Sequence, residues 1–229
     1  MTDDRSEGGS RILHHTRAQR SAGVAEVDAE VLAAIEAHVK RFVGEPAHVF
    51  HEIVSDIVHL DVHIVAPSAG RNCYTLFTTG MSALPMSAPP GADEFRYAEL
   101  MLSLPASWTK DPLWEANLED ESLYWPIRLL KTLARLPHEY GTWLGFGHTV
   151  PNGDPALPYA PNTELCCATI LVPVTADADF ATLNLRPDKT IHFYAVVPIH
   201  ESEMQLKLNK GTDALIDALD RAGVTDLVD

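Results

Sequence analysis

Two near-continuous apolar segments, residues 164–174 (ELCCATILVPV) and 190–199 (TIHFYAVVPI), place the strongest constraint on the fold of this chain. Neither approaches the roughly 18 apolar residues that a membrane-spanning helix requires. Short apolar runs of this kind, rich in β-branched and aromatic residues, are typical of strands that are covered on both faces. The sequence therefore predicts two central strands with other elements packed on each side.

Two longer segments have the apolar spacing of amphipathic helices. In residues 24–43 the apolar side chains recur every three or four positions and so share one face: Val27, Val31, Ile35, Val39 and Phe42. Residues 123–136 repeat the pattern, and we expect Pro126 in the first turn because proline lacks an amide donor. Pro137 and Gly141 are expected to end this second helix.

The remaining segments are mainly strand-like. Residues 57–65 alternate apolar and polar side chains, residues 73–81 are rich in strand-forming residues, and residues 95–104 form a further apolar run. A glycine-rich strand is expected over residues 141–150, and two short helices are expected at the end of the chain. Because strands outnumber helices and do not alternate regularly with them, the sequence predicts an α+β fold with one mixed β-sheet and helices packed on it.

The charge of the chain excludes two classes of partner. The sequence has 17 Lys and Arg against 32 Asp and Glu, a formal net charge of −15. Nucleic acids and anionic membrane surfaces attract basic proteins, so neither is expected to bind. Residues 1–23 are polar and aperiodic and are predicted to form a disordered tail, which leaves residues 24–229 as one domain. The tail is nearly neutral, so the domain carries the acidity.

The three cysteines, Cys73, Cys166 and Cys167, form no CxxC pair. We interpret them as buried reduced thiols in a cytoplasmic protein, because free cysteine behaves as a small apolar side chain. In a strand, Cys166 and Cys167 would point to opposite faces. The N-terminus has no apolar core of the length that a signal peptide needs, which agrees with a cytoplasmic location.

One predicted strand carries side chains suited to metal chemistry. His59, Asp61 and His63 alternate with apolar residues and would share one face about 6.5–7 Å apart, within reach of a common ion. Together with His51 they define one functional hypothesis, a metal-dependent hydrolase. The other interpretation is a solvated or hydrogen-bonded polar face, and it is favoured because no HExxH or CxxC motif accompanies these residues.

A possible pair of catalytic side chains precedes this strand. If residues 49–62 form a hairpin that turns at Ser55 and Asp56, Glu52 would lie opposite His59 and raise the pKa of its imidazole. Such a pair is more often structural than catalytic. No nucleophile or dinucleotide motif is complete in the sequence, and no cofactor is expected.

Five segments of the sequence resemble the suppressor-of-fused domain. They are VFHEIVSDIVHLDVHIVAP (49–67), YTLFTTGMSALPM (74–86), YAELMLSLPASW (97–108), WPIRLLKTLARLPHEYGTWLGFGHTVPNG (125–153) and FYAVVPIHESEMQLKLNKG (193–211). The resemblance covers roughly residues 38–222, and the block at 125–153 is long and specific. It implies a suppressor-of-fused-like sandwich, a mixed sheet with helices packed against it.

The resemblance also implies a class of function. In animals the family protein sequesters zinc-finger transcription factors of the Hedgehog pathway between two lobes. This chain has room for the N-terminal lobe only, so that activity is not expected to transfer. Bacterial single-domain members are regarded as interaction modules, some of them immunity proteins that neutralise secreted toxins, and none is an established enzyme.

We therefore expect a non-enzymatic module that sequesters a partner polypeptide. A basic toxin such as a nuclease fits the acidic surface through electrostatic steering, and strand addition at an open sheet edge is a second mode of capture. The expected partner-binding residues lie on the polar strand, in the loop 80–86 and in residues 143–148: His59, Asp61, His63, Met81, Ser82, Trp143 and His148. The sequence leaves the oligomeric state open, as well as the choice between a sheet edge and a cleft.

Overall fold

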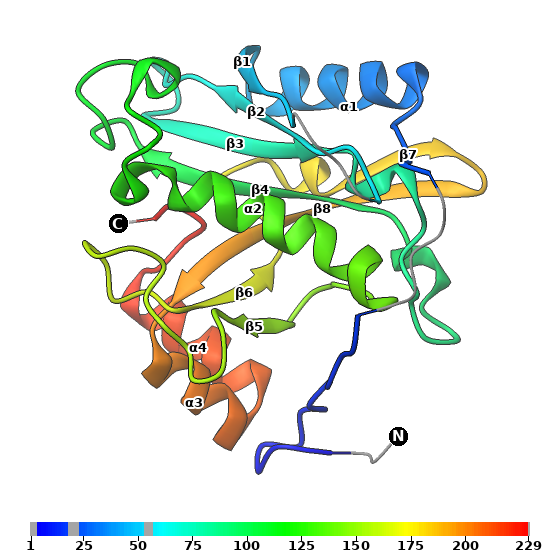
Figure 1. Cartoon of the computed structure of the whole chain (residues 1–229), viewed down its shortest axis with the longest axis vertical. Helices are drawn as coiled ribbons and strands as arrows, with labels where there is room; N and C mark the ends of the chain where they lie inside the picture. Colours follow the sequence, from blue (N-terminus) through cyan, green and yellow to red (C-terminus); the bar gives the residue numbers. More distant parts are fainter. Residues whose placement is uncertain (1–3, 18–22, 53–56, 229) are drawn as a thin grey trace.

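The computed structural model describes residues 4–17, 23–52 and 57–228, which form a mixed β-sheet with helices on both faces (Figure 1). The strands are β1 (Pro46–Phe50), β2 (Asp61–Val65), β3 (Cys73–Thr79), β4 (Ala98–Pro105), β5 (Thr149–Pro151), β6 (Cys167–Leu171), β7 (Thr182–Arg186) and β8 (Lys189–Ile199). The α-helices are α1 (Ala29–Phe42), α2 (Glu121–Tyr140), α3 (Glu201–Lys210) and α4 (Thr212–Ala222). Within the described ranges, none of the helices has the length and apolar character needed to cross a membrane.

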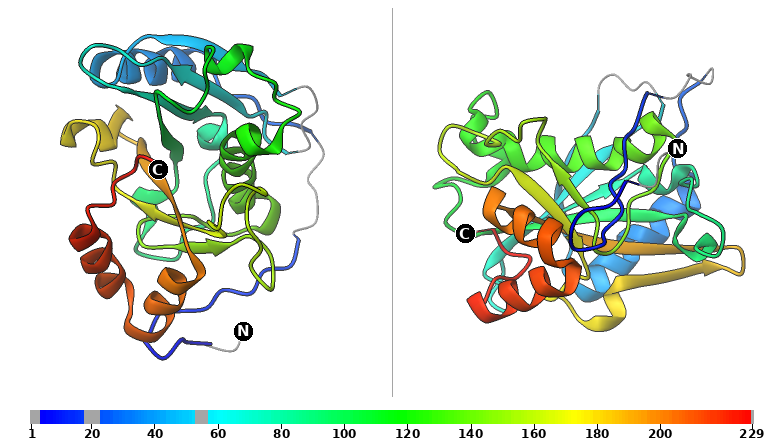
Figure 2. Two further views of the ribbon diagram at one scale, coloured as in Figure 1. Left: turned by 90° about the vertical axis from the view of Figure 1, so that its left-hand side faces the viewer. Right: turned by 90° about the horizontal axis from the view of Figure 1, so that it is seen from below.

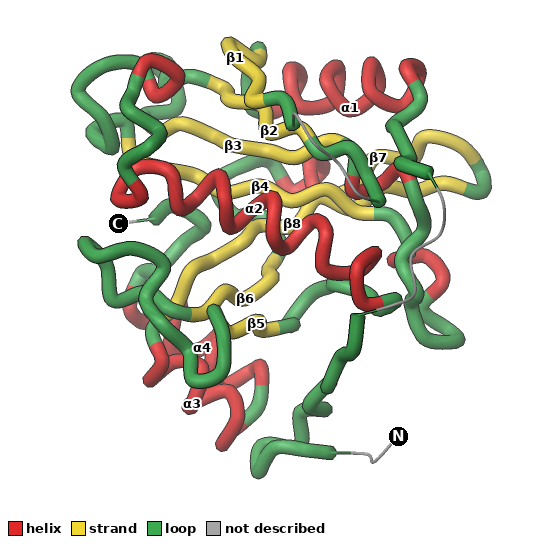
Figure 3. Tube along the Cα trace, viewed as in Figure 1, coloured by secondary structure: helices red, strands yellow, loops and turns green. Residues whose placement is uncertain are grey.

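The sheet is mixed because one central pair of strands is parallel. Its order is β1-β2-β3-β4-β8-β6-β5, and β7 pairs with the first part of β8. β4 and β8 run parallel, whereas the other neighbouring pairs are antiparallel. The α+β fold with one mixed sheet, predicted from the sequence, is confirmed. Figure 3 shows how its helices and strands are arranged.

β8 lies at the centre of the sheet and is covered on both faces, as its apolar sequence predicts. Tyr194 and Val196 belong to the apolar cluster that contains the buried residues of α2. Phe193 and Val197 belong to a second cluster, which contains the buried residues of α1 and α4. Figure 2 shows the same division, with α2 on the opposite side of the sheet from α1 and α4.

The first helix is shorter than predicted because a side chain caps it. Asp28 accepts a hydrogen bond from Glu30 N at 2.8 Å, so α1 begins at Ala29 rather than at residue 24. The apolar face predicted from the spacing is confirmed, since Val31 and Ile35 are buried against the sheet together with Val39.

The second helix is longer than predicted and contains both prolines. Pro126 lies in the second turn rather than the first. The Ser122 carbonyl, which proline leaves without its helical donor, accepts a hydrogen bond from Asn162 Nδ2 at 3.4 Å. The helix also continues past Pro137, and it ends where Gly141 adopts φ +58°.

The three cysteines are free and buried, as predicted. The prediction that Cys166 and Cys167 point to opposite faces is wrong. Cys166 precedes β6 instead of continuing it, and both side chains pack in the cluster on the α1 side with their Sγ atoms 3.8 Å apart.

The N-terminal segment lies against the domain where the structure describes it. Gly8 N donates a hydrogen bond to Leu208 O at 2.7 Å, and Arg17 pairs with Glu139. Residues 1–3 and 18–22 of the predicted tail lie outside the described residues. The disorder expected for residues 1–23 stays a prediction.

Candidate functional site

Three of the expected partner-binding residues lie in the interior of the protein. Met81 and Ser82 are fully buried and His63 is 3% exposed, so these side chains form no surface. His63 stacks on Phe77 with ring centroids 4.7 Å apart, and its Nε2 is hydrogen-bonded to Thr79 Oγ1 at 2.9 Å. Burial lowers the pKa of His63 to about 4, which leaves the ring neutral. Helix α1 covers this face of β2, a tertiary effect that the alternation of residues 57–65 does not encode.

Asp61 holds together the other members of the predicted metal site. Its carboxylate oxygens lie 3.0 Å from His51 Nδ1 and 3.3 Å from His59 Nε2. Among the described residues, no group of three or more His, Cys, Asp or Glu side chains is arranged to hold a metal ion. The hydrolase hypothesis requires His51, His59, Asp61 and His63 around one ion, and the described part of the chain does not assemble that site.

Glu52 joins this polar group to α2. Its Oε2 accepts a hydrogen bond from Leu60 N at 3.2 Å, and its Oε1 forms an ion pair with Arg135. The hairpin turn predicted at Ser55 and Asp56 lies outside the described residues. The Glu52 carboxylate therefore links the residue before β2 to α2, which is a structural role.

A buried carboxylate, Glu99 on β4, fixes the turn that follows β3. Its side chain accepts hydrogen bonds from Thr78 Oγ1 (2.7 Å), Gly80 N (3.1 Å), Ser82 N (3.0 Å) and Ser82 Oγ (2.7 Å). Gly80 has φ +110°, which brings the backbone amides of the turn around one carboxylate oxygen. This arrangement explains why Met81 and Ser82 point inward instead of forming a binding loop.

Two further elements hold the same turn. Lys189 on β8 is 8% exposed, and its Nζ donates to Ser82 O at 2.8 Å while lying 4.5 Å from the centre of the Tyr97 ring. His138 on α2 is hydrogen-bonded through Nε2 to Met81 O at 2.9 Å. Side chains from β4, β8 and α2 therefore converge on one short turn in the core.

The loop that follows this turn contacts the segment that leads to β5. Ser87 N donates to Thr142 O at 2.9 Å, and Leu144 N lies 3.4 Å from Met86 Sδ. Between these contacts lies Trp143, one of the expected partner-binding residues. Residues 142–144 are thus held in place by Met86 and Ser87.

The ionisation of Glu99 predicts a dependence of stability on pH. Burial raises the pKa of Glu99 from its ordinary 4.5 to about 7, although the hydrogen bonds from Ser82 and Thr78 lower it. The folded protein therefore binds this proton more tightly than the unfolded chain. Consequently the free energy of unfolding falls as the pH rises from about 4.5 to 7, by about 3 kcal/mol for this group.

The matched variant for this prediction is Glu99→Gln, which stays neutral at every pH. Its amide oxygen can accept from Gly80 and Ser82, and its amide nitrogen can donate to Thr78 Oγ1. Urea denaturation at pH 5 and pH 8 measures the effect. We expect wild type to lose stability relative to the variant between these values, and parallel profiles would contradict the prediction.

Residues 141–150 form a turn followed by a short strand, so the predicted glycine-rich strand is wrong except at Thr149–Pro151. A side chain on Gly145 would approach the Trp143 ring to 2.7 Å, and Gly147 has φ +78°, so the chain bends here instead of extending. Lys207 on α3 holds the bend by donating to Gly147 O and, at 2.8 Å, to Thr149 Oγ1. We call residues 145–148 the Phe146 turn.

The Phe146 turn presents its aromatic side chain to solvent. Phe146 is 51% exposed, whereas phenylalanine is usually buried. The neighbouring His148 meets the Trp143 ring edge-on at 4.5 Å, and burial and the charge of Lys207 lower its pKa to about 4. An exposed aromatic ring on a turn that is fixed in place is typical of an anchor residue in a protein interface.

β5 is the last strand of the sheet, and its outer edge has no neighbouring strand among the described residues. The loop 152–165 follows β5 and exposes 61% of Leu157. Two hollows meet at Pro158 in this loop, with volumes of about 530 Å³ and about 460 Å³. Their charged and polar lining comes from Glu164, His200, Glu201 and Ser202 in the larger hollow, and from Glu121, Arg128 and Tyr159 in the smaller. We call the Phe146 turn, β5, this loop and the two hollows the β5 surface.

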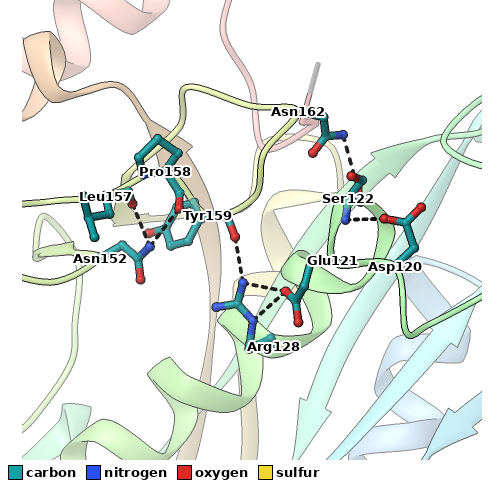
Figure 4. Close-up of polar contacts among 9 residues, drawn as sticks. All are labelled: Asp120, Glu121, Ser122, Arg128, Asn152, Leu157, Pro158, Tyr159 and Asn162. Carbon is teal, nitrogen blue, oxygen red and sulfur yellow. Dashed lines mark hydrogen bonds and ion pairs between the residues drawn. The ribbon is translucent and has the colours of Figure 1, made fainter.

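Polar contacts fix the loop of the β5 surface against the start of α2 (Figure 4). Arg128 Nη2 donates to Glu121 Oε2 at 2.8 Å and to Tyr159 O at 2.7 Å. Asn152 Nδ2 donates to Leu157 O at 2.7 Å. The backbone that carries the exposed Leu157 side chain is therefore held in one position before any partner binds.

Sequence reasoning missed Glu99 and Leu157, and it included Phe146 only as part of residues 143–148, without naming its ring. A signal for Glu99 exists, because it is the single ionisable residue in the apolar run 98–104. Phe146 also has one, since glycines on both sides predict a bend that leaves the ring without a strand neighbour. No local signal marks Leu157, whose exposure depends on how the loop folds back onto α2.

Comparison with known families identifies the chain. The model of the Suppressor of fused protein (SUFU) family matches residues 56–229. The chain belongs to the suppressor of fused family. The match covers β2 through α4, including the turn that Glu99 holds after β3 and the β5 surface, and it confirms the resemblance found in the sequence.

Solved structures show that this suppressor of fused chain has the family fold. A suppressor of fused homologue from Neisseria gonorrhoeae matches with a TM-score of 0.60 and 17% identity, over 87% of this chain and 91% of the other. A chain of the Sufu–Fu complex matches with a TM-score of 0.55 and 16% identity, over 83% and 84% of the two chains. Drosophila Suppressor of Fused matches with a TM-score of 0.51 and 14% identity, over 77% of this chain but 42% of its own. Curated protein sequences give no match.

Proposed function

We propose that this suppressor of fused chain is a non-enzymatic module that binds and sequesters a partner polypeptide. The observation that carries the proposal is family membership over residues 56–229, together with a solved complex, Sufu–Fu, in which a chain of the same fold is bound to a partner. Among the described residues there is no metal-binding cluster that would favour the hydrolase hypothesis. Partner binding is the activity that best fits these findings.

The β5 surface is the part of the molecule that best suits a partner. It combines an open strand edge, which can pair with an extended peptide, with two exposed apolar side chains, Phe146 and Leu157. Residues 143–148 also include Trp143 and His148, two of the partner-binding residues expected from the sequence. His59 and Asp61 belong instead to the polar group beside α2, where Asp61 contacts His51 as well.

Charge indicates the chemistry of the partner. The chain carries a net charge of −15, and Glu164 and Glu201 line the larger hollow of the β5 surface. A basic polypeptide would be steered toward this surface and would pair with its carboxylates. We therefore propose a basic protein as partner, and a secreted toxin neutralised by this chain in the cytoplasm is the specific case.

The substitution Phe146→Ser tests the surface. Truncating an exposed aromatic anchor is expected to weaken partner binding by about 30-fold, because such residues contribute 2 kcal/mol or more. The fold should be unaffected, since the ring is half in solvent. The matched control is Val174→Ser, which removes another exposed apolar side chain outside the β5 surface. Affinity is measured by calorimetry with the partner purified on wild-type bait, and equal loss in both variants would contradict the assignment.

The toxin hypothesis needs its own experiment. Co-production of this chain with the basic toxin encoded nearest to its gene is expected to restore growth of the host cell, and Phe146→Ser should restore it poorly. Rescue that is equal for wild type and Phe146→Ser would count against the β5 surface. No rescue by wild type, with both proteins produced, would count against the toxin as partner.

A further inference from the structure

The N-terminal segment contacts the protein beside the Phe146 turn. Gly8 N donates to Leu208 O at 2.7 Å, and a Cβ on Gly8 would lie 2.3 Å from Gly211 N, so two backbones meet there without side chains between them. Thr212 follows at once, and its Cγ2 lies 3.0 Å from the position of a Cβ on Gly147. In Figure 2 this segment, drawn in dark blue, passes across α3.

A second anchor lies at the end of α2. Arg17 Nη2 is 3.1 Å from Glu139 Oε1, and the His15 ring lies 6.1 Å from that of Tyr140. Glu139 and Tyr140 end α2, directly before the residues that lead into the Phe146 turn. His15 is also close enough to His148 for its charge to lower the pKa of that ring. The segment thus runs along one end of the β5 surface.

The chemistry of the segment matches that of the proposed partner. Residues 4–17 contain Arg5, Arg11 and Arg17 against the carboxylates of Asp4 and Glu7, whereas the domain that they contact is strongly acidic. They also carry an apolar side chain, Leu13, that is 39% exposed. Although the segment is nearly neutral overall, its three arginines and its apolar residue are side chains that the acidic, apolar β5 surface is expected to attract.

We propose that residues 4–17 form a strap that occupies one end of the β5 surface and competes with the basic partner. The strap rests on the proposed function, because competition requires that the partner binds at the β5 surface. A partner must displace the strap, so its apparent affinity is reduced by the fraction of molecules in which the strap is bound. The strap thereby keeps the surface from binding weakly basic proteins indiscriminately.

Two substitutions in the full chain release the strap at separate anchors. In Gly8→Val the side chain collides with backbone atoms of Lys210 and Gly211, which cannot move aside. In Arg17→Glu the attraction to Glu139 becomes repulsion. The control is Gly70→Ala, because a Cβ on Gly70 meets nothing within 4 Å. The probe is a synthetic nona-arginine peptide, and strap position is followed by the rate of trypsin cleavage after Arg11.

Both release variants are expected to be cleaved after Arg11 several-fold faster than wild type and to bind nona-arginine about tenfold more tightly. The control should match wild type in both measurements. Unchanged cleavage in both release variants, or faster cleavage without tighter binding, would overturn the strap. Failure of the proposed function is distinguished by adding Phe146→Ser to Gly8→Val: if this leaves nona-arginine affinity unchanged, the peptide binds elsewhere and the β5 surface itself is wrong.

Discussion

Replacing Glu99 with alanine is expected to lower the free energy of unfolding by about 3–5 kcal/mol at neutral pH. The substitution leaves Gly80 N and Ser82 N without an acceptor in the core. Burial lowers the pKa of Lys189, and the substitution removes one of the carboxylates that oppose this lowering. It also leaves a cavity where the side chain was fully buried. Chemical denaturation, with the midpoint and slope compared to wild type, measures the loss.

Two variants make this prediction specific. Glu119→Ala removes an exposed carboxylate and is expected to change stability by less than about 0.5 kcal/mol. Glu99→Gln keeps the shape and most of the hydrogen bonds and should retain most of the stability. A loss below about 1 kcal/mol in Glu99→Ala would mean that the buried turn does not depend on the carboxylate. A loss in Glu99→Gln equal to that in Glu99→Ala would mean that charge, rather than hydrogen bonding, holds the turn.

Replacing Gly80 with alanine is expected to cost at least about 3 kcal/mol of stability. A Cβ at this position would lie 1.9 Å from His59 O, a backbone atom on a neighbouring segment. Gly80 also has φ +110°, a backbone conformation that residues other than glycine rarely adopt. Either the turn shifts away from Glu99, or the segment before β2 shifts away from the turn. A drop in the thermal midpoint, measured by circular dichroism, reports the cost.

The control separates the collision from the backbone strain. Gly91 has φ +87° but a Cβ there meets nothing within 4 Å, so Gly91→Ala pays only the conformational cost of about 1 kcal/mol. The difference between the two variants is therefore the cost of the contact with His59 O. Equal losses would show that the close approach contributes nothing, and the account of the turn given by the structure would be wrong on that point.

The general fold could be predicted from the sequence because its strongest signals are local. The apolar run at 190–199 predicts a central strand and forms β8, and the spacing of Val31, Ile35 and Val39 predicts the buried face of α1. Element ends were predicted less well, because they depend on single contacts. Asp28 caps α1. Asn162 donates a hydrogen bond to the Ser122 carbonyl, which has no helical donor because residue 126 is proline, and α2 continues past that residue.

The candidate site could be predicted only in part, because burial is a tertiary property. The alternation at 57–65 identifies polar side chains but does not show that α1 covers His63. Likewise, Gly80 predicts a loop, and the buried Glu99 that turns Ser82 inward is contributed by a different strand. The contact between the Trp143 and His148 rings also depends on the short turn between them, which replaces the strand predicted from the sequence. The position of these two residues next to the edge strand β5 depends on the order of the strands in the sheet, which cannot be predicted from a local sequence pattern.

The place of β8 in the sheet has a consequence for how the protein is made. β4 ends at Pro105, yet the strand that pairs with its other edge begins at Lys189, after α2, β5, β6 and β7. A growing chain on the ribosome therefore carries an apolar, unpaired strand edge throughout the synthesis of those elements, and such an edge can pair with other chains. Pairing across so long a separation also makes folding slow. Production of this protein in cells is thus expected to depend on chaperones that bind nascent chains until β8 has emerged.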